Sequence, residues 1–189
     1  MAVIEVSAVG GISIGGERVM GTPVGVFGAN LAVALGICRA LGVEPDDVGR
    51  RVSTLPSAEH RQSVTTAGAG FTIIDDTFNS NPAGARSALE LLSDLGADGR
   101  KAVITPGMVE LGPVQDEVNR AFAEGAADRV DHFVIVGKTN RKALTEGSVN
   151  GRASVSVVDS RDEAVAWAQA NLGPGDAVLY ENDLPDHYP

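Results

Sequence analysis

The densest polar cluster of this sequence covers residues 75–82, which read DDTFNSNP. The cluster follows a short apolar run and precedes a helical pattern. Carboxylates in such a place can hold ribose hydroxyls or order the water shell of a metal ion, and amides can donate and accept hydrogen bonds. Helix capping and turn formation use the same residue types. The cluster therefore predicts either a ligand site or a structural turn.

Three other places carry residues suited to binding. The loop 106–112 has glycines near both ends, and its Glu110 can orient a partner or simply be solvated. His60 and Arg61 lie in a polar connector, where an arginine can grip a phosphate with two donors or belong to a surface pair. Asn30 opens a helix, and its amide can face a purine or ribose or cap the helix.

Several common sites are excluded by spacing. Residues 137–139 read GKT, but a phosphate-binding P-loop needs a glycine where His132 stands, so a turn with a solvated lysine is the better interpretation. The stretch 25–30 has only two glycines and does not make a dinucleotide loop. The single Cys38 excludes a disulfide scaffold and a cysteine-based zinc site.

Composition limits the partners of the chain. It has 189 residues, of which 43% are hydrophobic and 21% charged, with a net charge of −10, as in a soluble globular protein. No basic stripe is present, so we expect no nucleic-acid partner. The most apolar stretch, 28–41, is too short for a membrane span and contains Arg39. No signal-peptide pattern is visible at the N-terminus, so a cytoplasmic location is expected.

From residue 70 onward, short apolar runs alternate with helical patterns. The predicted strands are 71–75, 102–105, 133–136, 155–158 and 177–180. Strands joined by helices predict a doubly wound, Rossmann-like α/β domain with a mainly parallel sheet. In such sheets ligands bind at the carboxyl ends of the strands, so residues 75–77, 106–108 and 181–183 are expected to lie at that edge.

Helix signals support this reading. Asn81 is predicted to cap a helix with Pro82 as its first residue, and Ser160 with Glu163 forms a capping box. The first helix should end at Gly96 and present one apolar face, made of Ala85, Ala88, Leu89, Leu92 and Leu95. The helix 114–127 should use the side made of Val114, Val118, Ala121 and Phe122.

Residues 1–57 have a different texture. Two β-like runs, 3–9 and 17–20, flank a pair of glycines and predict a hairpin. The helix 28–41 is apolar nearly all round, so we expect it to be buried on most faces and to end at Gly42. A second helix is predicted from Pro45 to about residue 53.

Residues 74–82, IDDTFNSNP, resemble a signature of the Mur ligases, which are ATP-dependent amide ligases of peptidoglycan assembly. Residues 105–112 resemble the next loop of that family, and 30–42 resembles the last long helix of its central ATPase domain. His60-Arg61 is similar to the linker that follows this helix. The pattern is most similar to the branch of the family that adds D-alanyl-D-alanine.

The resemblance implies an organisation and a chemistry. Residues 1–57 would be the end of the central ATPase domain, 58–69 a linker and 70–189 the C-terminal domain. ATP would convert a carboxylate to an acyl phosphate, Mg²⁺ would assist, and an amine would form the amide. The implied partners are ATP, amino-acid or nucleotide-sugar peptide substrates, and the rest of the ligase chain. Implied ATP-binding residues are Asn30, Arg61 and Asp76, and implied substrate-binding residues are Asn79, Asn81 and Glu110.

Three departures from the family pattern matter. No complete P-loop occurs, so we expect the isolated chain not to use ATP. Phe78 replaces the usual tyrosine, and residues 180–189 do not resemble the lysine–glycine–serine–arginine run of the D-alanyl-D-alanine-adding branch. The alternatives are a non-catalytic Rossmann-like module that binds a nucleotide or an amino acid, and a structural interaction domain.

Overall fold

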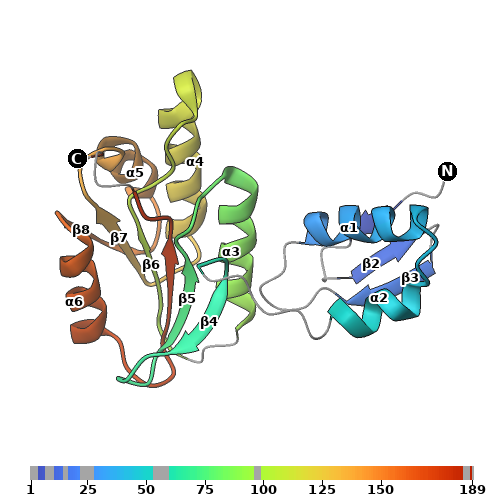
Figure 1. Ribbon diagram of the computed structural model, residues 1–189. Helices are drawn as coiled ribbons and strands as arrows, with labels where there is room; N and C mark the ends of the chain where they lie inside the picture. The colour runs from blue at the N-terminus through green and yellow to red at the C-terminus, as the bar shows by residue number, and fades with distance from the viewer. Residues whose placement is uncertain are drawn as a thin grey trace. The chain divides into compact units, whose positions relative to one another are not determined.

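The computed structural model describes residues 4–6, 11–14, 17–21, 28–52, 60–95, 99–184 and 188 (Figure 1). Contacts between residues divide the chain into two units, 1–58 and 59–189. Each unit is a separate body with its own sheet. Among the described residues, no helix is both long enough and apolar enough to cross a bilayer.

The first unit is a small antiparallel sheet with two helices. Its elements are β1 (Ile4–Val6), β2 (Gly11–Ile14), β3 (Glu17–Gly21), α1 (Gly28–Ala40) and α2 (Pro45–Val52). The strand order is β1-β2-β3, so the partner of β3 is β2. The predicted hairpin between 3–9 and 17–20 was therefore wrong in its first strand, because the glycine at the start of β2 weakens that strand's signal.

Helix α1 is less buried than its composition suggests. Leu31 and Leu35 pack with Val52 in a small core, and the helix ends before Gly42, whose φ of +77° suits glycine. The exposed fractions of three apolar side chains lie between 57% and 77%, namely Val33, Ile37 and Leu41. The prediction of burial on most faces was wrong, because the described elements that pack against α1, mainly β1, β2 and α2, leave these side chains exposed.

The second unit confirms the doubly wound α/β fold. Its strands are β4 (Ser63–Thr66), β5 (Thr72–Asp76), β6 (Lys101–Thr105), β7 (His132–Val136), β8 (Ser154–Val158) and β9 (Ala177–Glu181). Their order is β4-β5-β9-β6-β7-β8. Every pair is parallel except β4 with β5. The helices are α3 (Pro82–Asp94), α4 (Gln115–Ala127), α5 (Arg141–Ser148) and α6 (Arg161–Asn171).

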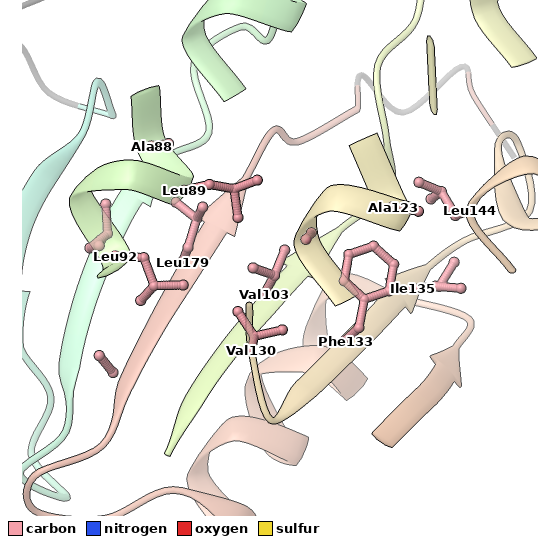
Figure 2. Packing of buried hydrophobic residues seen from close by; sticks show 13 residues of the cluster. Ala88, Leu89, Leu92, Val103, Ala123, Val130, Phe133, Ile135, Leu144 and Leu179 are labelled. Carbon is pink, nitrogen blue, oxygen red and sulfur yellow. The ribbon is translucent and has the colours of Figure 1, made fainter. Parts of the chain in front are cut away.

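Alternate residues of the central strands serve two cores. Val103, Phe133 and Leu179 pack against α3, α4 and α5, as Figure 2 shows with Leu89 and Leu92 beside Leu179. The intervening strand residues pack against α6 on the other face of the sheet, in a cluster that includes Ala102, Ile104, Val134, Val178, Ala164 and Ala168. Helices therefore cover both faces, as a parallel sheet requires.

Strand β4 was not predicted. It lies in the segment 58–69 that the sequence suggests is a connector, because its four residues, SVTT, are mostly polar. All but the first of these side chains are exposed, since β4 is an antiparallel edge strand. An edge strand of this kind needs no apolar alternation, and its partner β5 supplies the burial.

Helix starts agree better with prediction than helix faces do. The expected face of α3 is confirmed, with Ala85, Ala88, Leu89 and Leu92 buried, while Gly96 lies outside the described residues. The Ser160 half of the capping box is confirmed, since its hydroxyl accepts from the Glu163 N–H at 3.2 Å. The Glu163 carboxylate accepts from the Asp159 N–H at 2.8 Å, one residue before the N–H that a capping box uses.

Helix α4 uses a different face from the one predicted. Its buried residues are Asn119, Ala123, Ala126 and Ala127, whereas Val114 and Ala121 are exposed. The reason is the close approach of α5, where a Cβ added to Gly147 would lie 2.2 Å from the Arg120 carbonyl oxygen. Small residues face this contact, so the larger apolar side chains point elsewhere.

Two helical glycines give a matched test of this packing. Gly147→Ala should destabilise the fold by about 1–3 kcal/mol, because the added methyl collides with α4. Gly125→Ala should instead stabilise it by about 0.5–1 kcal/mol, because nothing lies within 4 Å of the new Cβ and alanine is the better helix former. Urea unfolding measures both, and effects of equal sign would contradict the close contact.

Candidate functional site

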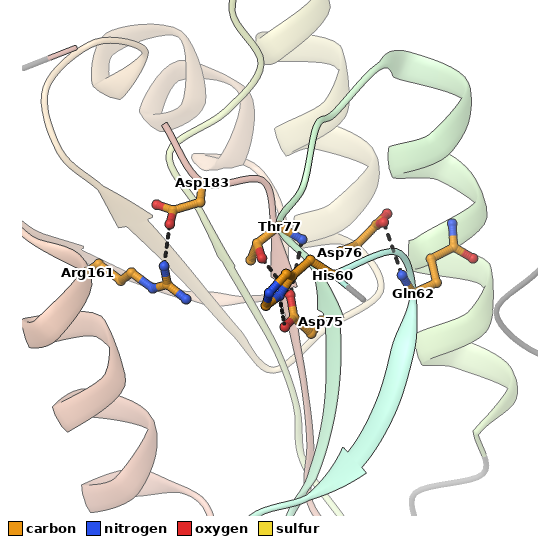
Figure 3. A network of polar contacts seen from close by, with 7 residues as sticks. All are labelled: His60, Gln62, Asp75, Asp76, Thr77, Arg161 and Asp183. Carbon is orange, nitrogen blue, oxygen red and sulfur yellow. Dashed lines mark hydrogen bonds and ion pairs between the residues drawn. The ribbon is translucent and has the colours of Figure 1, made fainter. Parts of the chain in front are cut away.

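The carboxyl ends of β5, β9 and β6 are neighbours in the sheet, and polar side chains gather there (Figure 3). The chain before β4 lies against this edge. The His60 ring nitrogen Nδ1 is 2.7 Å from an Asp75 carboxylate oxygen, and the Gln62 N–H donates to Asp76 at 3.2 Å. The Phe78 N–H donates to the His60 carbonyl at 3.0 Å. Residues 60–62 are thus bound to the end of β5.

The segment 60–62 has an unusual backbone. His60 and Gln62 have φ values of 58° and 51°, in the left-handed region that few non-glycine residues adopt. The contacts with Asp75, Asp76 and Phe78 hold this conformation in place. Backbone strain of this kind is concentrated at functional sites.

Arg61, predicted to bind phosphate, lies between these two residues and is exposed. The carbon of its guanidinium is 4.3 Å from the centre of the Phe78 ring, a cation–π contact. This contact orients the side chain without using its hydrogen-bond donors. Arg61 precedes Gln62, whose N–H donates to Asp76, so Arg61 lies in the segment that is bound to the end of β5. The arginine charge opposes the rise in the pKa of Asp76.

The pKa values of the two aspartates at the end of β5 are shifted in opposite directions. Burial raises the pKa of Asp75, but hydrogen bonds from Thr77 and His60 outweigh it, so the net shift is downward. The Thr77 hydroxyl donates to that carboxylate at 2.6 Å. Burial also raises the pKa of Asp76, and there the Gln62 hydrogen bonds and Arg61 only partly oppose it. Asp75 is consequently a structural anion, and Asp76 the more basic acceptor.

The loop between β5 and α3 carries the predicted substrate residues. Asn79 is exposed. Asn81 caps α3, because its side-chain oxygen accepts from the N–H groups of Ala83 and Gly84 at 3.1 and 3.0 Å. The capping interpretation of Asn81 is confirmed, and its amide nitrogen is the part left for a ligand.

A buried carboxylate lies beneath this edge. Glu181, at the end of β9, is completely buried and accepts hydrogen bonds from the hydroxyls of Ser80 and Thr105, the second at 2.9 Å. Burial raises the pKa of Glu181 to about 7, although both hydrogen bonds act in the opposite direction. One side chain therefore joins the loops that follow β5 and β6.

Three buried amides hold the loop 106–112. The Asn119 side chain donates to the Met108 carbonyl and accepts from the Met108 N–H, both at 2.8 Å. Asn140 donates to the Pro106 carbonyl at 2.9 Å, and Asn182 to the Gly107 carbonyl at 2.7 Å. The amides come from α4, the start of α5 and the end of β9, so the loop is fixed from three directions.

Glu110 lies in this same loop. It is exposed and has a φ of 63°, which directs attention to a function because the conformation is disfavoured for a side chain of its kind. Asn30 belongs to the first unit, where it is the third residue of α1 and is exposed.

The cavity at the carboxyl edge is small. Its volume is about 20 Å³, and it is lined in part by Thr77, Pro106, Tyr180 and Asp183. Arg161 of α6 pairs with Asp183 across one side (Figure 3). A volume of this size suits a water molecule, so a larger ligand would lie across the edge rather than inside it.

Sequence reasoning missed the supporting residues. Glu181 and Asn182 were expected at the edge but given no role, and Asn119 and Asn140 were not singled out. An acid directly after the apolar run 177–180 is a usable signal for Glu181. No local pattern distinguishes the two asparagines from helix-surface residues.

The buried acid gives a pH-dependent test. Because the pKa of Glu181 is higher in the folded than in the unfolded chain, folding binds a proton between the two values. The free energy of unfolding should therefore fall as pH rises, by up to about 1.4 kcal/mol per pH unit between the unfolded value and 7. Glu181→Gln should remove this slope, as urea unfolding at several pH values would show. An unchanged slope would contradict a raised pKa at this site.

A second test separates capping from ligand binding. Asn81→Ala should lower the free energy of unfolding by about 1 kcal/mol, because α3 loses its cap. Asn79→Ala, two positions earlier and exposed, should change stability by less than about 0.5 kcal/mol. Equal losses in thermal unfolding experiments would mean that Asn79 also has a structural role.

Comparisons with known proteins place this geometry in a family. A protein-family model described as "Mur ligase, glutamate ligase domain" matches residues 60–180. The UDP-N-acetylmuramoyl-tripeptide–D-alanyl-D-alanine ligase of Mycobacterium leprae is 32% identical over 181 residues, covering 82% of this chain and 34% of that protein. The UDP-N-acetylmuramoylalanine–D-glutamate ligase of Lachnoclostridium phytofermentans is 27% identical over 150 residues, covering 79% and 31%.

A solved structure agrees in fold. The MurF ligase from Thermotoga maritima in complex with ADP superposes with a TM-score of 0.65 at 22% identity, over 96% of this chain and 43% of that one. The chain thus spans about a third of the length of the curated relatives that it matches. With the family model covering most of the second unit, the chain belongs to the Mur ligase family.

Proposed function

We propose that this chain is the C-terminal part of an ATP-dependent acid–amino acid ligase of the Mur type, acting in peptidoglycan or related cell-wall synthesis. The observation that carries the proposal is the docking of residues 60–62 on the end of β5, which brings Arg61 and Asp76 together. Membership of the family supplies the reaction class. Residues 1–57 would then be the end of the central ATPase domain.

The reaction has two steps. A substrate carboxylate attacks the γ-phosphorus of ATP, giving an acyl phosphate and ADP. The amine of the second substrate then attacks the acyl carbon, phosphate leaves, and the amine loses a proton as the amide forms. Positive charge from a metal ion and a lysine stabilises the transferring phosphoryl group in such reactions.

The residues of this chain would bind and orient the reactants. Arg61 would face the phosphates, since its donors remain available above the Phe78 ring. Asp76 would accept a hydrogen bond from a ribose hydroxyl, and Asn30 would lie near the adenine. The amine substrate would meet a surface formed by Asn79, the amide nitrogen of Asn81, and Glu110.

The residues fit a nucleotide better than they fit a metal ion. An exposed guanidinium beside a carboxylate suits a phosphate and a ribose. Within the described parts of the chain, no group of three or more His, Cys, Asp and Glu residues is arranged to hold a metal. Ligands for Mg²⁺ would therefore come from ATP and from residues outside this set. The P-loop lysine would also come from another part of the ligase chain, because the sequence has no complete P-loop.

The identity of the amine substrate is inferred from the relatives and from the end of the chain. The relatives add D-alanyl-D-alanine or D-glutamate according to their names. Residues 180–189 of this chain do not resemble the lysine–glycine–serine–arginine run of the D-alanyl-D-alanine-adding branch. This difference supports an amine substrate other than D-alanyl-D-alanine.

Activity of the complete polypeptide tests the proposal. The reading frame that precedes codon 1 should encode a P-loop. The complete polypeptide should release ADP only when a UDP-N-acetylmuramoyl peptide and an amino acid or dipeptide are both present. The 189-residue chain alone should release none. ADP release by the 189-residue chain alone would contradict the proposal that the phosphate-binding P-loop lies outside it. A reading frame that encodes no P-loop would favour a non-catalytic binding module.

Variants of the complete polypeptide locate the ATP contacts. Arg61→Gln and Asp76→Ala should each raise the KM for ATP about tenfold, the effect of losing one charge-assisted hydrogen bond. Lys142→Gln is the matched control, because this lysine is exposed on α5 and lies outside the site. Unchanged KM values in the first two variants would exclude them from the nucleotide site.

A further inference from the structure

A groove separate from the carboxyl-edge site runs between α3 and α4. Its volume is about 320 Å³, at the lower end of the range for small-molecule pockets. Leu89 of α3 and Met108 of the loop after β6 form part of its lining, and both are buried. Val118 and Phe122 of α4 line it as well. The groove is therefore apolar and is backed by the core of the second unit.

The groove explains the apolar face of α4 that does not meet the sheet. The face of this helix that its periodicity picks out includes Val118, Ala121 and Phe122, and all three line the groove. The face that packs on the fold is made of smaller residues. Phe122 is also tied to the core, since its ring lies 6.4 Å from that of Phe133. The helix thus has two apolar faces, of which the sheet and α5 cover only one.

Space in the groove is kept open by Gly125. A Cβ built on this residue meets nothing within 4 Å. Glycine in the interior of a helix costs about 1 kcal/mol relative to alanine, and no close contact requires it here. Because Gly125 lines the groove, its lack of a side chain leaves the groove open at this point.

Two arginines line the same groove. Arg86 comes from α3, and Arg129 follows the end of α4. Both side chains are exposed, and in the described part of the chain neither forms an ion pair. Asp128 precedes Arg129 and Glu90 follows Arg86 by four residues on α3, but the charged residues that line the groove itself are the two arginines.

We propose that the groove between α3 and α4 binds a small amphiphilic anion, an apolar chain or ring that carries a carboxylate. The apolar part would lie along Val118, Ala121 and Phe122, and the anionic group would pair with Arg86 or Arg129. A guanidinium binds a carboxylate through two parallel hydrogen bonds. None of the proposed ATP- and substrate-binding residues lines the groove, but Pro82 of its lining follows Asn81, and Met108 lies in the loop that carries Glu110.

Decanoate is a suitable probe, with decyltrimethylammonium as the cation of matched chain length. In NMR titrations of the ¹⁵N-labelled 189-residue chain, below micelle formation, decanoate should shift the amides of residues 83–89 and 118–129. The cation should bind at least about tenfold more weakly, because its ammonium group is repelled by the arginines and cannot pair with them as a carboxylate does. Equal binding of the two probes, or shifts spread over other faces, would overturn the proposal.

Three variants complete the test. Gly125→Leu should abolish decanoate binding by filling the groove, while leucine improves the helix and the thermal midpoint does not fall. Arg86→Gln or Arg129→Gln should raise the Kd about tenfold, whereas Lys142→Gln on α5 should leave it unchanged. If sedimentation shows a dimer that Gly125→Leu converts to a monomer, a second copy of the chain fills the groove and the proposal fails.

Discussion

The carboxyl edge of the sheet is held together from beneath by one buried carboxylate. Glu181 ends β9, the strand that lies between β5 and β6, and it accepts hydrogen bonds from Ser80 and Thr105 in the two flanking segments. Burying an acid costs free energy unless hydrogen bonds satisfy it. Ser80 lies in the loop that presents Asn79 and Asn81, and Thr105 is the last residue of β6, directly before the loop that presents Glu110. The geometry of the candidate substrate surface therefore depends on this acid.

The fold was predictable where burial determines residue type. Parallel strands packed on both faces are continuously apolar, so the apolar runs 102–105, 133–136 and 177–180 were correctly predicted to be strands. The face of α4 that α5 buries and the exposed position of β4 at the edge of the sheet were not predictable, since both depend on neighbours distant in sequence. Periodicity therefore chose the wrong face of α4, and the polar edge strand β4 escaped notice.

The sequence pointed to the segments of the candidate site but not to the residues that support them. Asp76 and Arg61 were proposed from residue type and family resemblance, and the hydrogen bond from the Gln62 N–H to Asp76 joins their two segments. Asn119 and Asn140 hold the loop 106–112 by donating hydrogen bonds to its carbonyl groups. The positions of these carbonyl groups depend on the folded path of the loop and cannot be derived from the sequence. The left-handed backbone at Glu110 is equally invisible, because any residue type can be forced into it by such anchors.

Anchoring by buried groups also restricts how this edge can differ from its relatives. The hydroxyls of Ser80 and Thr105 both donate to the Glu181 carboxylate. A lysine at position 181 would place an ammonium group between them, and because an ammonium group can only donate, both hydroxyls would have to accept instead. Thr105 also accepts from the Gly107 N–H at 2.9 Å, so its hydroxyl proton is directed toward Glu181. The acid at position 181 and the start of the loop after β6 are thus coupled through the Thr105 hydroxyl.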